Sequence, residues 1–104
     1  MDESLAFKDD QGHRISAVLS PPSRPGNAVV VLCHGFLSNK NSTTNKALTR
    51  MLNEAGVAAL RFDFFGQGES EGLLEDITVS IAVGQAKAAL THAQSRGYER
   101  LGLM

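Results

Sequence analysis

A short glycine-rich segment holds the first residues that could do chemistry. Residues 68–72 satisfy the pattern G-x-S-x-G, in which a serine at a tight strand-to-helix turn acts as a nucleophile. Ser70 lies well beyond the predicted strand end at Phe62 and well before the predicted helix cap at Thr78, so neither flanking element of such a turn adjoins it. The two glutamates beside it would also oppose an alkoxide. We therefore expect Ser70 to be a structural loop residue rather than a nucleophile.

A second candidate segment begins with His34 and Gly35, directly after the apolar run at residues 28–33. A glycine that follows a buried strand lets the backbone turn sharply, and the next amide proton can then point into open space. Such an amide can bind a developing oxyanion. The alternative is an ordinary strand-to-helix turn with a buried, hydrogen-bonded His34. A general-base role for His34 is disfavoured because no orienting carboxylate lies nearby in the sequence.

Composition limits the possible classes of function. The 104 residues are 42% apolar and 20% charged with a formal net charge of −1, which is typical of one soluble globular domain. Balanced, scattered charge provides no basic surface for nucleic acid or an anionic membrane. The first residues are acidic and no apolar stretch approaches the ~20 residues of a spanning helix. We expect a cytoplasmic protein without membrane or nucleic-acid partners.

Nucleotide, metal and cofactor sites are also disfavoured. Residues 66–71 miss the last glycine of the dinucleotide-binding pattern, and carboxylates in and after this loop would repel a pyrophosphate. Residues 35–40 lack the second glycine of a phosphate loop. The three histidines share no ligand spacing with Cys33 or with paired carboxylates. We expect neither a metal nor a cofactor, and an inert, packed thiol at Cys33.

The elements that must position these segments alternate between strand and helix. Alternating apolar runs at residues 5–8 and 14–19 predict an antiparallel hairpin with its turn near Gly12. Continuous apolar runs at 28–33 and 57–62 are typical of parallel strands buried on both faces, and residues 98–104 begin another.

Two helical patterns lie between the predicted parallel strands. The first covers residues 47–55, with Ser42 or Thr43 as N-cap and Gly56 as its stop. The second runs from Thr78 to Gly97. Its apolar stripe consists of Val79, Val83, Ala86, Leu90 and Ala93. Right-handed crossovers would place the two helices on opposite faces if the strand order reverses between them.

The sequence VVVLCHGF at residues 29–36, then a helix, then RFDFFGQGES at residues 61–70, resembles the first half of an α/β-hydrolase. It is most similar to cinnamoyl or feruloyl esterase-like enzymes and serine aminopeptidase-type hydrolases. The resemblance implies an α/β fold: strands 1 to 5 of the hydrolase sheet in the order 1-2-4-3-5, the first strand antiparallel, with one helix on each face. Residues 1–104 would form a single N-terminal portion of the domain that ends before the nucleophile elbow.

The resemblance also implies roles for single residues. The backbone N–H of Phe36 matches the family's first oxyanion donor, in a loop shaped by His34 and Gly35. Asp63 precedes the nucleophile position, whereas the triad acid of this superfamily follows it, so Asp63 is expected to hydrogen-bond the glycine loop instead. The remaining structural loop residues are Gly66, Gly68 and Ser70.

The implied function is a serine-type hydrolase of carboxylic esters or related acyl bonds. This chain would supply the oxyanion-loop half, and the nucleophile, acid and histidine would follow Met104, so we predict that the chain alone is inactive and takes a substrate only when completed. One alternative is a non-catalytic hydrolase-like module, and another is a small complete α/β binding domain unrelated to hydrolases. We expect the open edge of the last strand to pair with a second copy or with the remaining half.

Overall fold

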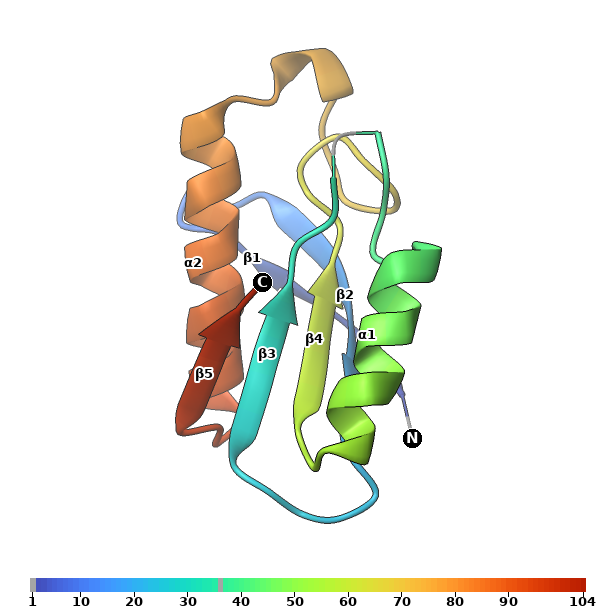
Figure 1. Ribbon diagram of the computed structural model, residues 1–104. Helices are drawn as coiled ribbons and strands as arrows, with labels where there is room; N and C mark the ends of the chain where they lie inside the picture. Colours follow the sequence, from blue (N-terminus) through green and yellow to red (C-terminus); the bar gives the residue numbers. More distant parts are fainter. Residues whose placement is uncertain (1, 36) are drawn as a thin grey trace.

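The computed structural model describes residues 2–35 and 37–104. One five-stranded sheet has the order β1-β2-β4-β3-β5, with helices packed against it (Figure 1). The strands are β1 (Glu3–Lys8), β2 (Arg14–Ser20), β3 (Ala28–Leu32), β4 (Ala58–Phe62) and β5 (Arg100–Leu103), and the helices are α1 (Thr43–Glu54), the short η1 (Leu74–Asp76) and α2 (Val79–Ser95).

The first strand was predicted to be antiparallel, and it is antiparallel to its neighbour, but the strand that runs against all the others is β2. β1 pairs antiparallel with β2, and β2 pairs antiparallel with β4, so β2 runs against the other strands of the sheet. β3 lies between β4 and β5 and is parallel to both. The predicted fold class and strand order are confirmed.

The two long helices cover opposite faces of the sheet, α1 in front and α2 behind in Figure 1. Alternation along β4 shows why both faces need cover. Ala58, Leu60 and Phe62, at every second position of β4, belong to the core under α2. Ala89 and Ala93 of α2 belong to the same core. Arg61 points to the other face, where its guanidinium donates to Thr49 Oγ1 of α1 at 3.1 Å.

Local sequence signals define the helix ends. Ser42 Oγ accepts the N–H of Asn45 at 3.2 Å and begins α1, and Thr78 Oγ1 accepts the N–H of Ile81 at 3.1 Å and begins α2. Gly56 follows α1 with φ +82°, a conformation that suits glycine after a helix.

The predicted apolar stripe of α2 is only partly the buried face. Val79 and Val83 are 81% and 49% exposed, whereas Gln85, Ala89 and Ala93 pack against the sheet. Small alanines let the helix approach the strands closely, and both the oxygen and the nitrogen of the Gln85 amide are hydrogen-bonded there. α2 carries apolar residues on more than one face. Helical periodicity alone therefore predicted the wrong buried face for the first two turns of α2.

Candidate functional site

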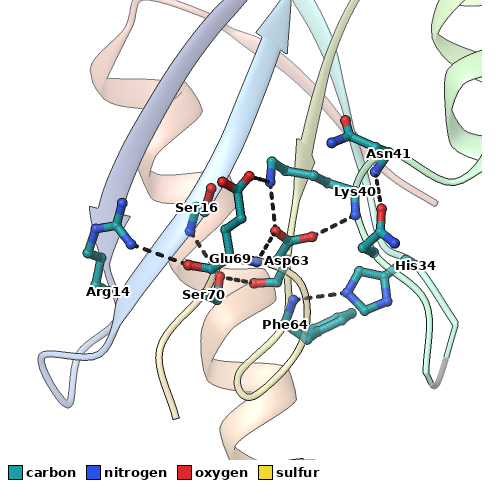
Figure 2. Close-up of polar contacts among 10 residues, drawn as sticks. Arg14, Ser16, His34, Lys40, Asn41, Asp63, Phe64, Glu69 and Ser70 are labelled. Atoms are coloured by element: carbon teal, nitrogen blue, oxygen red, sulfur yellow. Dashed lines mark hydrogen bonds and ion pairs between the residues drawn. The ribbon is translucent and has the colours of Figure 1, made fainter.

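His34 lies between the loops that follow β3 and β4, at the carboxyl ends of two adjacent parallel strands. Its Nε2 accepts the backbone N–H of Phe64 at 3.0 Å (Figure 2). The ring proton therefore belongs on Nδ1, which donates to the carbonyl oxygen of Gly35 at 2.7 Å. With both nitrogens engaged, the buried His34 ring ties the two loops together and has no free nitrogen for general-base catalysis.

Gln67, in the loop after β4, also binds the loop after β3. Its side chain is buried, and Oε1 accepts the backbone N–H of Leu37 at 2.9 Å. Leu37 has φ +61°, a left-handed conformation that costs a non-glycine residue ~1 kcal/mol or more. The Gln67 amide thus fixes a strained backbone position in the β3 loop. Sequence reasoning missed Gln67, and its only signal was its position between two loop glycines.

Asp63 is the fully buried centre of the site. Its Oδ1 accepts the backbone N–H of Lys40 at 2.7 Å, and its Oδ2 accepts Lys40 Nζ at 2.7 Å and the N–H of Glu69 at 2.9 Å (Figure 2). One carboxylate therefore binds the β3 loop through Lys40 and the glycine loop through Glu69. Lys40 Nζ also reaches Glu69 Oε1 at 2.8 Å.

The Lys40 ammonium is charged in this setting. Its side chain is 4% exposed, and burial alone would lower its pKa. The hydrogen bonds and negative charges of Asp63 and Glu69 outweigh that burial, so the pKa of Lys40 is raised above its ordinary value. Lys40 was not among the residues selected from the sequence, because its partner lies 23 positions away.

Two loop glycines are required by close packing. Gly68 has φ +55°, and a side chain there would overlap the Asp63 carboxyl group. Gly66 has φ +75°, and an added Cβ would lie 2.6 Å from the backbone of Leu74. Both positions therefore need glycine for conformation and for space.

Ser70 joins strand β2 to the glycine loop. Its hydroxyl donates to the carbonyl oxygen of Asp63 at 2.6 Å and accepts the N–H of Ser16 at 2.9 Å (Figure 2). Strand β4 ends at Phe62, α2 begins at Val79, and Ser70 lies in turns between them. Within residues 2–35 and 37–104, no histidine hydrogen-bonds this hydroxyl.

A second buried network connects the β1–β2 turn to the β4 loop. Gln85 Nε2 donates to Asp9 Oδ2 at 3.1 Å, and Gln85 Oε1 accepts the N–H of Phe65 at 2.8 Å. Asp9 Oδ2 also lies 2.9 Å from His13 Nδ1. Burial acts to raise the pKa of Asp9, but hydrogen bonds from His13, Gln85 and Gln11 outweigh it and lower the pKa. In the described part of the chain, no hydroxyl or thiol hydrogen-bonds this His–Asp pair.

The predicted oxyanion donor, the N–H of Phe36, lies outside the described residues, and its role stays a prediction. Its two neighbours are both held in place. The carbonyl oxygen of Gly35 accepts His34 Nδ1 and also the N–H of Ser38 at 3.2 Å, and the N–H of Leu37 is bound by Gln67. The roles assigned from the sequence to His34 and Gly35 depend on that donor and likewise stay predictions.

Neither a cluster of metal-ligating side chains nor a membrane-spanning helix occurs in the described residues. No group of three histidine, cysteine or carboxylate side chains there could hold a metal ion. No helix in the same part of the chain is both long and apolar enough to cross a bilayer.

Comparisons with known proteins place this geometry in a family. No family model matches the chain. The chain is similar to Est1E of Butyrivibrio proteoclasticus, solved with ferulic acid bound, with a TM-score of 0.88 and 26% identity over 95% of this chain and 41% of that one. A hydrolase candidate from Agrobacterium vitis S4 gives a TM-score of 0.86 and 27% identity over 99% and 40%. The chain belongs to the α/β-hydrolase superfamily.

A curated relative agrees with this hydrolase assignment. The mitochondrial palmitoyl-protein thioesterase ABHD10 of Bos taurus is 38% identical over 50 residues, which are 48% of this chain and 16% of that protein. The Pyrococcus furiosus esterase, at 17% identity and a TM-score of 0.87 over 99% of this chain, shares the fold. The chain spans about two fifths of the solved structures that it matches.

Proposed function

We propose that the chain is the oxyanion-loop half of a serine-type hydrolase that cleaves carboxylic esters or related acyl bonds. The observation that supports this function is the rigid attachment of the β3 loop on both sides of Phe36. His34 and Gln67 fix the residues next to it, and Asp63 fixes Lys40 further along. Oxyanion stabilisation depends on amides held in position before the reaction begins.

In this proposal the Phe36 N–H donates to the oxygen that becomes negative when a nucleophile attacks the acyl carbon. Losing one such donor costs about 10²- to 10³-fold in rate, so this amide assists a reaction that other groups must perform. In the described residues the Ser70 hydroxyl bridges Ser16 and Asp63 and hydrogen-bonds no histidine. The proposal therefore assigns the nucleophile, the acid and the histidine to further polypeptide.

Two relatives support a substrate class for this proposal. Est1E was solved with ferulic acid, a carboxylic acid, and the Bos taurus protein is named for an acyl thioester. Both compounds present an acyl carbon next to an oxygen or sulfur. We therefore favour an acyl compound as the substrate of the completed enzyme, with no cofactor.

Two assays test this function. The 104-residue chain should hydrolyse p-nitrophenyl acetate no faster than buffer, because losing a nucleophile or its base costs roughly 10⁴- to 10⁶-fold. Turnover that disappears in Ser70→Ala would refute the assignment of Ser70 as a loop residue. Sequencing the source gene beyond codon 104 should reveal a second G-x-S-x-G shortly after Met104. Its absence would refute the proposal that the chain is half of a serine-type hydrolase.

The longer polypeptide encoded there provides a test of the oxyanion donor itself. Phe36→Pro removes the backbone N–H and should lower kcat by about 10²- to 10³-fold with little change in KM. Phe36→Leu retains the N–H and is the matched control. Equal kcat values for the two variants would exclude this amide as an oxyanion donor.

A second candidate function is a non-catalytic module that binds through its exposed strand. The unpaired outer edge of β5 favours it, since the strand order ends there within the described residues. A partner at this edge would take the place of the remaining half of a hydrolase, so the two functions are alternatives for the same strand edge.

A further inference from the structure

Two side-chain contacts bind the end of α2 to strand β1. The His92 ring stacks on the Phe7 ring, with their centroids 4.9 Å apart and an interplanar angle of 15°. One turn further along the chain, the Arg96 guanidinium donates to the two carboxylate oxygens of Glu3 at 2.6 and 3.1 Å. The docking of this helix end therefore depends on two groups that can take up a proton in acid, His92 and Glu3.

The His92 ring has a nitrogen without a partner. Nε2 is buried, and among the described residues it has no hydrogen-bond partner. In a neutral imidazole one nitrogen carries no proton, whereas a protonated ring carries an N–H donor at both nitrogens. Protonation of the stacked ring would therefore bury a charged donor without an acceptor, which is costly. Because the atom is already buried, additional polypeptide cannot supply an acceptor while the ring stays on Phe7.

The charges around His92 add to this effect. Burial lowers the pKa of His92, the positive charge of Arg96 lowers it further, and the negative charge of Glu3 acts in the opposite direction. His92 also borders a groove of about 460 Å³ between β1 and α2. The charged groups that line this groove are two of each sign: Lys8, Lys87, Asp9 and Asp10. The docked ring is thus favoured in its neutral form.

We propose that His92 is a proton-sensitive contact that releases the end of α2 from β1 in mild acid. When the ring takes up a proton, it leaves Phe7 and turns toward the groove, where water can solvate the new N–H. The neighbouring ion pair stays charged meanwhile, because hydrogen bonds from Arg96 lower the pKa of Glu3. The proposal does not rest on the hydrolase function, so either can fail without the other.

The ordinary pKa of histidine sets the size of the effect. Above about pH 6.5 the ring is neutral in the docked and the released states, and pH favours neither. Below that value the released state binds a proton that the docked state does not, so docking weakens as the pH falls. If the docked ring takes up no proton, the released state gains a factor of about 30 between pH 7.5 and pH 5. This factor is the upper limit.

Amide hydrogen exchange at pH 7.5 and pH 5 tests the proposal, with each rate corrected for the pH dependence of exchange in an unfolded chain. Residues 89–95, at the end of α2, should lose protection by up to about 30-fold at pH 5. Residues 47–54 of α1 lie on the opposite face of the sheet and serve as an internal control. Their protection should change much less.

Three variants identify the group that responds. His92→Phe keeps an aromatic stack on Phe7 and takes up no proton, so residues 89–95 should be equally protected at both pH values. His92→Gln removes the stack as well, and it should give lower protection that is also the same at both pH values. His13→Gln is the matched control, because His13 binds Asp9 in the β1–β2 turn. It should keep the pH dependence of the wild type.

Equal protection of residues 89–95 at the two pH values in the wild type would overturn the proposal, because protonation would then leave the contact intact. A loss that His92→Phe and His92→Gln share with the wild type would also overturn it, since another group would then be responsible. An equal loss in α1 would show that acid destabilises the whole fold rather than this contact.

Discussion

Replacing Lys40 by methionine tests whether the buried ion pair with Asp63 holds the two loops together. Methionine keeps the apolar stem and removes the ammonium, so the Asp63 carboxylate loses its charged partner while completely buried. Breaking a buried pair from one side costs about 3 to 5 kcal/mol. Two backbone N–H groups, from Lys40 and Glu69, still bind Asp63, so we expect a loss near the lower figure.

Urea unfolding followed by circular dichroism measures this loss. A loss of about 3 kcal/mol is a large part of the 5 to 15 kcal/mol by which a domain of this size is stable. The midpoint should fall by roughly 1 to 3 M urea with an unchanged slope. Lys46 is exposed on α1, and Lys46→Met as the matched control should change stability by no more than about 0.5 kcal/mol.

A double variant separates the charge from the packing. In Lys40→Met with Asp63→Asn, no buried carboxylate is left without its partner, so the double variant should be at least ~1 kcal/mol more stable than the sum of the single losses predicts. If Lys40→Met costs under ~1 kcal/mol, or the two losses simply add, the ion pair is not what holds the loops.

The pKa of Lys40 adds a pH dependence to the same experiment. Because its pKa is raised in the folded state, the ion pair contributes its full stability below the ordinary lysine value of ~10.4. That contribution is lost as the pH rises through the raised value. The stability difference between wild type and Lys40→Met should therefore stay constant from pH 7 to about 10 and shrink above it.

Three further substitutions test the loop and α2. Ser70→Ala should lower the free energy of unfolding in urea by about 1 to 3 kcal/mol, because the backbone N–H of the buried Ser16 loses its acceptor. Gly68→Ala should cost more than ordinary loop substitutions, since its Cβ would overlap Asp63 at a left-handed φ, and a loss under 1 kcal/mol would contradict the close packing. Gly84→Ala should raise the melting temperature, because the added Cβ would lie at an ordinary 3.6 Å from Asp10 Oδ1 and alanine gains about 1 kcal/mol in a helix.

The fold was predictable because its signals are local. Continuous apolar runs marked β3 and β4, and the caps Ser42 and Thr78 each bind an N–H three residues away. Strand order came from the family resemblance, which periodicity alone could not supply. The buried face of the first two turns of α2 was missed because Val79 and Val83 satisfy the same helical spacing as the residues that contact the sheet.

The internal contacts of the site were less predictable because its hydrogen bonds join distant positions. Gln67 and Leu37 lie 30 residues apart, and Gln85 and Asp9 lie 76 apart. A polar side chain in a sequence gives no indication of which distant amide it will bind. Such hydrogen bonds can be identified only in the folded structure, where the carboxyl ends of β3 and β4 lie side by side.

The G-x-S-x-G pattern in this chain has a physical origin different from that of a nucleophile. Gly68 is glycine because the Asp63 carboxyl group occupies the space of its side chain. Ser70 is a hydroxyl residue because it must donate to Asp63 O and accept from Ser16 at the same time. Both requirements come from packing the glycine loop against Asp63 and β2, and a loop built this way reproduces the letters of the motif without its strand or its helix. A serine in such a motif is therefore identified as a nucleophile by a free hydroxyl beside a base, and Ser70 has already used its proton.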